Sequence, residues 1–267
     1  MNASFHRPCW IIGNWKMHKT VGEAEEFLRS LLSHSPPSEK TIGLAVPFTA
    51  LYTLSQAAAG SFVKIGAQNM NAADEGAFTG EIAATMLQEA GATFVLLGHS
   101  ERRRFFSEDT GVVNRKVQKA LQIDLLPIVC IGELHFTETT ELTQEFLKTQ
   151  ICETLAEIPA EALARVALAY EPVWATGRGK PADPSYVQEM HLFCRKILQE
   201  LANEEIAHRI PILYGGSITG ENAHQFLQQP DVDGLLIGGA SLFVESFVQI
   251  MNDGADPSSL EQGIDNP

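Results

Sequence analysis

The sequence predicts a closed (β/α)8 barrel that forms a single α/β domain. Eight short apolar runs recur along the chain, and most of them are nearly continuous rather than alternating. Continuous apolar runs are typical of parallel strands that are covered on both faces. Helical patterns separate the runs, and 267 residues are a normal length for such a barrel. An open, doubly wound sheet is the alternative, but it seldom needs eight regular units.

Each element is predicted from its own stretch of sequence. The predicted strands lie at 10–16, 42–47, 62–68, 94–100, 125–133, 165–172, 210–217 and 232–241. The predicted helices lie at 21–34, 81–92, 114–122, 141–158, 184–202 and 222–229, and a short helix is expected to start within 238–247. In the first helix Phe27, Leu28 and Leu31 recur at helical spacing with charged residues opposite. The barrel is expected to span residues 1–251, and the polar, acidic segment 252–267 is expected to be a disordered tail.

The composition restricts the partners. A formal net charge of −14 repels nucleic acid and anionic membranes, so an anionic ligand would need a local cationic site. The first 16 residues lack the apolar segment of a signal peptide, and no run approaches the ~20 apolar residues that span a bilayer. We therefore expect a cytoplasmic protein without a nucleic-acid or membrane partner. The spacing of Cys9, Cys130, Cys152 and Cys194 fits neither a metal site nor a redox motif, so reduced thiols are expected.

Polar residues and a glycine pair lie at the carboxyl ends of several predicted strands, where enzymes of this fold build their sites. They are Asn14, Lys16, His99, Glu101, Glu171, Ser217, Gly238 and Gly239. Taken singly, most have ordinary explanations: His99 can be a polar residue at a strand end, Lys16 a solvated charge, and the glycine pairs tight turns. Glu171 is harder to explain, because a carboxylate among apolar neighbours is costly unless it is paired or protonated. Together they indicate an active site.

The residue types indicate proton transfer next to a carbonyl group. Glycine-rich turns after the last two strands can offer backbone N–H groups to an anion, and Lys16 adds a positive charge. Glu171 can act as a general base, while His99 and Lys16 can polarise a carbonyl and stabilise an enediolate. The sequence shows no metal cluster and no dinucleotide fingerprint, so neither a metal nor another cofactor is expected. A phosphorylated small molecule is the substrate that fits these groups.

Five motifs resemble the triosephosphate isomerase family. They are "GNWKM" (13–17), "GHSERR" (98–103), "AYEPVWA" (169–175), "YGGSI" (214–218) and "GGASL" (238–242), and the resemblance covers residues 8 to 251 or so. It implies a TIM barrel that interconverts dihydroxyacetone phosphate and D-glyceraldehyde 3-phosphate without a cofactor. It also implies roles for single residues. Glu171 would be the base, His99 the electrophile, Lys16 the electrostatic clamp and Asn14 a hydrogen-bond donor; Gly177, Ser217, Gly238 and Gly239 would hold the phosphate, and Glu101 would lie near Lys16.

The resemblance further implies a homodimer. The segment 68–81 is similar to a long loop of the family that inserts into the neighbouring subunit, and Thr79 would then approach the partner subunit's Asn14 and Lys16. An exposed Phe78 at the tip of this loop favours insertion over an ordinary surface loop. Two other functions stay open from the residues alone: another phosphate-binding barrel isomerase, and a non-catalytic protein that binds sugar phosphates.

Overall fold

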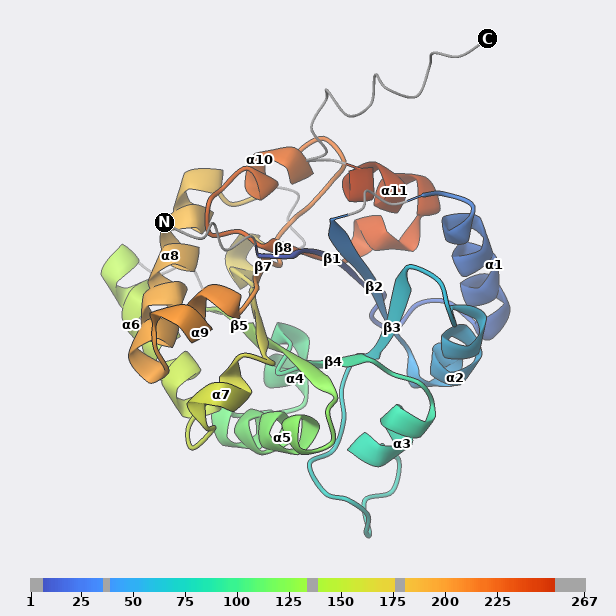
Figure 1. The fold of residues 1–267 in the computed structure, drawn as a ribbon, viewed down its shortest axis with the longest axis horizontal. Helices are drawn as coiled ribbons and strands as arrows, with labels where there is room; N and C mark the ends of the chain where they lie inside the picture. Colours follow the sequence, from blue (N-terminus) through green and yellow to red (C-terminus); the bar gives the residue numbers. More distant parts are fainter. Residues whose placement is uncertain (1–6, 36–38, 134–138, 176–180, 253–267) are drawn as a thin grey trace.

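The computed structural model describes residues 7–35, 39–133, 139–175 and 181–252. Eight parallel strands form a closed barrel in chain order, and β1 pairs with β8 to close it (Figure 1). The strands are β1 (Cys9–Asn14), β2 (Lys40–Val46), β3 (Val63–Ala67), β4 (Phe94–Leu97), β5 (Leu126–Ile131), β6 (Ala167–Tyr170), β7 (Ile212–Tyr214) and β8 (Gly234–Ile237). The predicted barrel is therefore confirmed, and the open sheet is excluded.

Helices surround the strands, and most of them form an outer ring, whereas the short helix α4 (Ser100–Phe105) lies nearer the barrel (Figure 1). They are α1 (Val21–Leu32), α2 (Phe48–Ala57), α3 (Ala84–Glu89), α4 (Ser100–Phe105), α5 (Thr110–Gln122), α6 (Thr140–Thr154), α7 (Ala160–Leu163), α8 (Pro184–Leu201), α9 (Glu204–Arg209), α10 (Ala223–Leu227) and α11 (Val244–Asn252). Two short 3₁₀ turns, η1 (Val173–Ala175) and η2 (Gly239–Leu242), follow β6 and β8. Within the described residues no helix is long and apolar enough to cross a bilayer.

The predicted elements differ from the observed ones mainly at their ends. The runs at 165–172, 210–217 and 232–241 shrink to four, three and four residues of strand. Hydrophobicity marks burial, and apolar residues beyond the sheet are buried against helices as well. The helices α2, α4, α7 and α9 were not predicted. Helices α4, α7 and α9 have six residues or fewer, which is too few for a periodic pattern. Helix α2 is longer, but no side-chain hydrogen bond caps its start, so this signal of a helix is missing there.

Side chains fill the inside of the barrel as a packed core. Phe94 on β4 points into it, and its ring lies against the Cα positions of Gly43 on β2 and Gly66 on β3. A Cβ at Gly66 would overlap that ring, and one at Gly43 would lie only 3.0 Å from it, so these two strands make room for one large side chain. The larger cluster lies between the strands and the helices and includes Trp15, Phe27 and Phe247. The interior of the barrel is therefore filled, and in this fold functional sites are built on the loops at one end.

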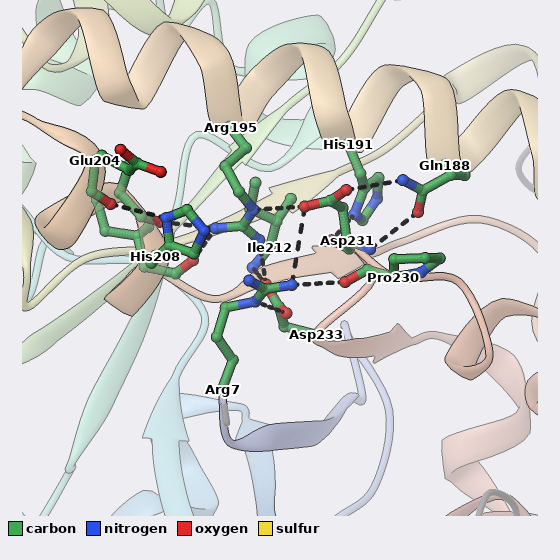
Figure 2. Close-up of polar contacts among 12 residues, drawn as sticks. Arg7, Gln188, His191, Arg195, Glu204, His208, Ile212, Pro230, Asp231 and Asp233 are labelled. Carbon is green, nitrogen blue, oxygen red and sulfur yellow. Dashed lines mark hydrogen bonds and ion pairs between the residues drawn. The ribbon is translucent and has the colours of Figure 1, made fainter. Parts of the chain in front are cut away.

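A buried ionic network lies at the amino-terminal end of the strands (Figure 2). Arg195 on α8 donates from Nε to Asp231 at 2.8 Å and from Nη2 to Asp233 at 2.5 Å. The Nε of Arg7 donates to Asp233 from the opposite side, and the backbone N–H of Ile212 donates to the same carboxylate at 2.9 Å. The network thus ties α8, the start of β7 and the segment before β1 to the start of β8. This end of a barrel generally serves stability, not catalysis.

His191 on α8 belongs to this network and gives the fold a pH dependence. The ring is fully buried, its Nδ1 contacts the carbonyl of Asp231 at 3.0 Å, and burial lowers the pKa of His191 from 6.5 to about 4. Between those values the unfolded chain binds a proton that the folded protein excludes. We therefore expect this group's contribution to be complete above pH 6.5 and to fall by about 3 kcal/mol as the pH drops to 4. Denaturant unfolding measured across this range tests it.

The matched variants are His191→Asn, which keeps a donor near the position of Nδ1, and His34→Asn, which changes an exposed histidine. The first should flatten the dependence of the unfolding free energy on pH between 4 and 6.5, and the second should leave it unchanged. Identical slopes in His191→Asn and the unaltered protein would contradict the assignment.

Candidate active site

The polar residues singled out in the sequence lie at the carboxyl ends of their strands. Asn14 is the last residue of β1, and Glu171 directly follows β6. His99, two residues after β4, is the N-cap of α4, while Gly238 and Gly239 directly follow β8. Because the strands are parallel and the barrel is closed, these positions all surround one mouth.

The carboxylate of Glu171 meets the ring of His99. Its side chain is buried, and Oε1 lies 2.9 Å from Nε2 of His99, while Oε2 accepts a hydrogen bond from the backbone N–H of Ser100 at 3.1 Å. The two side chains come from β4 and β6, which are not neighbours in the barrel, so they meet across its mouth. A carboxylate and an imidazole in contact form a pair that can move protons.

Two glycines make the seat of Glu171. A Cβ at Gly132 would overlap the backbone carbonyl of Glu171, and a Cβ at Gly215 would lie 2.9 Å from its Cγ. Gly132 also has a φ of 149°, in the region that L side chains rarely adopt. The backbone N–H of Glu171 donates to Ile131 at 2.7 Å, which continues the barrel pairing beyond β6. The base candidate is thus held by backbone on both sides.

The hydrogen bonds of His99 fix its tautomer. Its Nδ1 accepts the backbone N–H of Glu101 at 3.2 Å, and a ring nitrogen that accepts carries no proton. The proton of the neutral ring therefore lies on Nε2 and faces Glu171. Burial alone would lower the pKa of His99, but the Glu171 carboxylate outweighs it, so this pKa lies above its usual value. For Glu171 burial acts in the other direction and would raise the pKa. The contact with His99 and the hydrogen bond from the Ser100 N–H outweigh burial, so the pKa of Glu171 lies below its usual value.

Lys16 lies at the same mouth of the barrel, on the loop after β1. Its Nζ forms an ion pair with Glu101 at 2.7 Å, and its backbone N–H donates to the side chain of Asn14 at 3.1 Å. The φ of Lys16 is 52°, and Gln68 fixes this backbone by donating to the Lys16 carbonyl at 2.9 Å. Asn14 and Gln68 therefore set where the lysine side chain starts, and Glu101 holds its end. The expected neighbourhood of Lys16 and Glu101 is observed.

The glycine turn after β8 lies beside Lys16. A Cβ at Gly238 would come within 3.7 Å of Cε of Lys16, whereas a Cβ at Gly239 would meet nothing within 4 Å. Ser241 donates its hydroxyl to the Gly238 carbonyl at 2.7 Å, which keeps the turn closed. An anion at Gly239 would thus meet backbone amides, open space and a nearby lysine.

Three predicted residues are not brought into this cluster by the described contacts. Ser217 donates its hydroxyl to the carbonyl of Ala175 at 2.8 Å, and so it connects the loop after β7 to η1. Gly177 lies outside the described residues. Thr79 is exposed on the loop between β3 and α3, which projects beyond the helix ring (Figure 1).

Two residues near the site had not been assigned a role from the sequence. Glu133 is buried just after β5 and accepts hydrogen bonds from Trp174 Nε1 at 2.6 Å and from Tyr170 at 3.1 Å. Burial raises the pKa of Glu133, although these hydrogen bonds oppose the shift. Arg103 donates to the carbonyls of Gly98 at 2.7 Å and Cys130 at 3.2 Å, which joins the ends of β4 and β5. The sequence does carry a signal for Glu133, because this residue ends an apolar run as Glu171 does.

The fold and this mouth define a barrel enzyme with a carboxylate–imidazole pair, and a lysine lies beside a glycine turn. The family model for triosephosphate isomerase matches residues 9–254. A triosephosphate isomerase of Protochlamydia amoebophila is 54% identical over 96% of this chain and 97% of its own. Those of Chlamydia trachomatis serovar L2 and Carboxydothermus hydrogenoformans are 47% and 44% identical, over 91% and 92% of this chain and 88% and 98% of their own. The chain belongs to the triosephosphate isomerase family.

Proposed function

We propose that the pair of Glu171 and His99 carries the interconversion of dihydroxyacetone phosphate and D-glyceraldehyde 3-phosphate. As a member of its family the chain is an isomerase with a phosphorylated three-carbon substrate and a place in glycolysis. The observation that carries the residue assignment is the 2.9 Å contact between Glu171 Oε1 and His99 Nε2 at the mouth of the barrel. This contact supports the assignment, because a carboxylate and an imidazole so close together can act on one small substrate.

The reaction then follows from the chemistry of the two groups. The Glu171 carboxylate takes a proton from C1 of dihydroxyacetone phosphate, and the C–H electron pair forms a double bond to C2. The carbonyl electron pair moves to O2, where the Nε2 proton of His99 and the charge of Lys16 stabilise the enediolate. The hydroxyl proton is transferred from O1 to O2 through His99, and Glu171 returns its proton to C2. This leaves an aldehyde at C1. The side-chain amide of Asn14, next to Lys16, donates a hydrogen bond to the substrate.

The substrate changes the state of His99. The contact with Glu171 is the largest of the influences that raise the pKa of His99. This contact breaks when the carboxylate turns toward a substrate carbon. Burial, the Glu101 N–H at Nδ1 and the charge of Lys16 then favour the neutral ring. A neutral imidazole that donates from Nε2 can polarise the carbonyl and then pass a proton between the two oxygens.

The phosphate is assigned to the turn after β8. Gly238 and Gly239 can offer backbone N–H groups, and Lys16 lies beside them. Ser217 and Gly177 stay in the proposed phosphate site on the family resemblance alone. Another phosphate-binding barrel isomerase is not favoured, because the family model covers the chain almost end to end. A non-catalytic binding protein would have no use for the pair of Glu171 and His99.

The site is tested by measuring inhibitor affinity and kcat in the variant Lys16→Met. Lys16 supplies local positive charge to a chain of net charge −14, and it acts on the bound substrate and on the enediolate alike. We expect about a 10- to 100-fold weaker affinity for a phosphorylated inhibitor, together with a fall in kcat. The control is Lys64→Met, which removes the same charge at an exposed position on β3. Unchanged inhibitor affinity in Lys16→Met would overturn the role of this lysine.

We also propose a homodimer in the cytoplasm. Phe78 is 52% exposed on the projecting loop, and Phe105 and Phe106 at the end of α4 are each 64% exposed. Exposed aromatic groups of this size are typical of protein interfaces. In the dimer Thr79 would approach the partner subunit's Asn14 and Lys16. We expect Phe78→Asp to shift the protein toward folded, poorly active monomers in sedimentation. A fully active monomer of the unaltered protein at assay concentration would contradict this.

A further inference from the structure

A second lysine lies on the loop after β1, and it contacts the other end of the η2 turn. Lys19 donates from Nζ to the backbone carbonyl of Leu242, the last residue of η2, at 2.9 Å. Its ammonium group also lies 5.3 Å from the ring centroid of Trp15 and 4.7 Å from that of Phe27. The two lysines of this loop thus lie at opposite ends of one turn, Lys16 near Gly238 and Lys19 at Leu242.

We propose that Lys19 is a positioning residue that fixes η2, so that the amides of Gly238 and Gly239 hold the substrate phosphate. The inference rests on the proposed phosphate site and adds a residue to it. The proposed role is indirect: Lys19 contacts the carbonyl end of the turn, and the phosphate is assigned to its amide end.

The carbonyl end of η2 has two donors from the loop after β1. Besides Lys19, the indole Nε1 of Trp15 donates to the carbonyl of Ser241 at 3.0 Å. Trp15 is fully buried and packs edge-on against Phe27, with the ring centroids 5.0 Å apart. These contacts leave the last carbonyls of η2 satisfied, and a cation at a carbonyl end complements its partial negative charge. The turn is therefore anchored to a buried part of the core.

The backbone of Lys19 is held in an unusual conformation that supports this role. Its φ is 74°, in the left-handed region that favours glycine, and such residues persist where their surroundings fix them. The next residue, Thr20, is the N-cap of α1, and its backbone N–H donates to Glu23 at 2.7 Å. The side chain is half-buried, which lowers the pKa of Lys19, while Glu23 acts in the opposite direction. A left-handed residue before a helix cap thus aims this ammonium group at η2.

The test compares Lys19→Met and Lys19→Arg in the otherwise intact protein. The measurements are the inhibition constant of inorganic phosphate as a competitor, the KM and kcat for substrate, and the melting temperature. In Lys19→Met we expect phosphate to bind about 3- to 10-fold more weakly and KM to rise by a similar factor, with kcat within about twofold. Lys19→Arg should restore both constants, because arginine keeps the donor and the contact with the rings. A purely structural role would lower the melting temperature and leave the phosphate constant unchanged.

Two further variants separate the possible failures. Gly239→Ala places a methyl group in the space assigned to the phosphate without meeting the protein, so it should weaken phosphate binding by itself. If it does not, the proposed phosphate site is wrong, and the inference is wrong with it. If Gly239→Ala weakens phosphate and Lys19→Met does not, only the role of Lys19 is overturned. Equal weakening in Lys64→Met would assign the effect to net charge and would also overturn it. Lys19→Gln supplies the same readout if the methionine variant does not fold.

Discussion

Replacing Glu171 with glutamine is expected to lower kcat by about 10²–10⁴-fold or more, with substrate binding largely retained. Glutamine keeps the size of the side chain and its seat between Gly132 and Gly215, so the barrel should not change. It cannot accept the proton that the reaction moves. The measurement is a coupled isomerase assay, with inhibitor affinity determined on the same preparation.

A matched control for this variant is Glu161→Gln, which removes one carboxylate from the exposed surface of α7. Its kcat should stay near that of the unaltered protein. If Glu171→Gln turns over substrate at a comparable rate, another group is the base, and the contact of Glu171 with His99 has a structural purpose.

Replacing Arg195 with methionine is expected to destabilise the protein by about 3–5 kcal/mol. The arginine is buried and pairs with Asp231 and Asp233, and it also donates to the carbonyls of Ala207 at 2.7 Å and Ile210 at 3.1 Å. Methionine would fill the space and leave those carboxylates and carbonyls short of a donor. A loss of this size is a large part of the stability of a typical protein, so it should be plain in denaturant unfolding.

Arg209→Met is the control for that variant. Arg209 forms an exposed pair with Glu205 one helical turn away, and such pairs contribute at most a few tenths of a kcal/mol. A loss below about 1 kcal/mol in Arg195→Met would mean that Arg7 alone can satisfy Asp233, and that the network is less tightly coupled than its hydrogen bonds indicate.

The predictions made from the sequence succeeded where one local signal decides the structure. Continuous apolar runs mark parallel strands, and the position of Glu171 directly after β6 follows from the run that it ends. The seat of Glu171 was not predictable, because Gly132 and Gly215 reach it from two other strands and only the register of the barrel brings them together. Glu133 has the same local pattern as Glu171, yet its partners are Tyr170 and Trp174.

The ionic network at the other end of the barrel was not predictable for the same reason. Arg195 and Asp233 are 38 residues apart, and their pairing depends on how α8 packs against the start of β8. Charged residues on a helix usually face solvent, so a sequence pattern favours exposure for Arg195. Arg195 is buried because the closed barrel brings Asp231 and Asp233 together beside it.

The contact between Arg7 and Asp233 lies where the first and last strands close the barrel, and this affects how the chain can fold during its synthesis. The two residues are 226 positions apart, and β1 pairs with β8 right beside them. A ribosome adds roughly 5–20 residues per second, so β1 waits on the order of 10–45 s before its last partner has been synthesised. During that time β1 is an open edge of the growing sheet, and an open apolar edge can pair with another chain. A nascent chain halted before Asp233 should therefore need a chaperone to stay in solution, whereas release of the full-length chain lets the sheet close on itself.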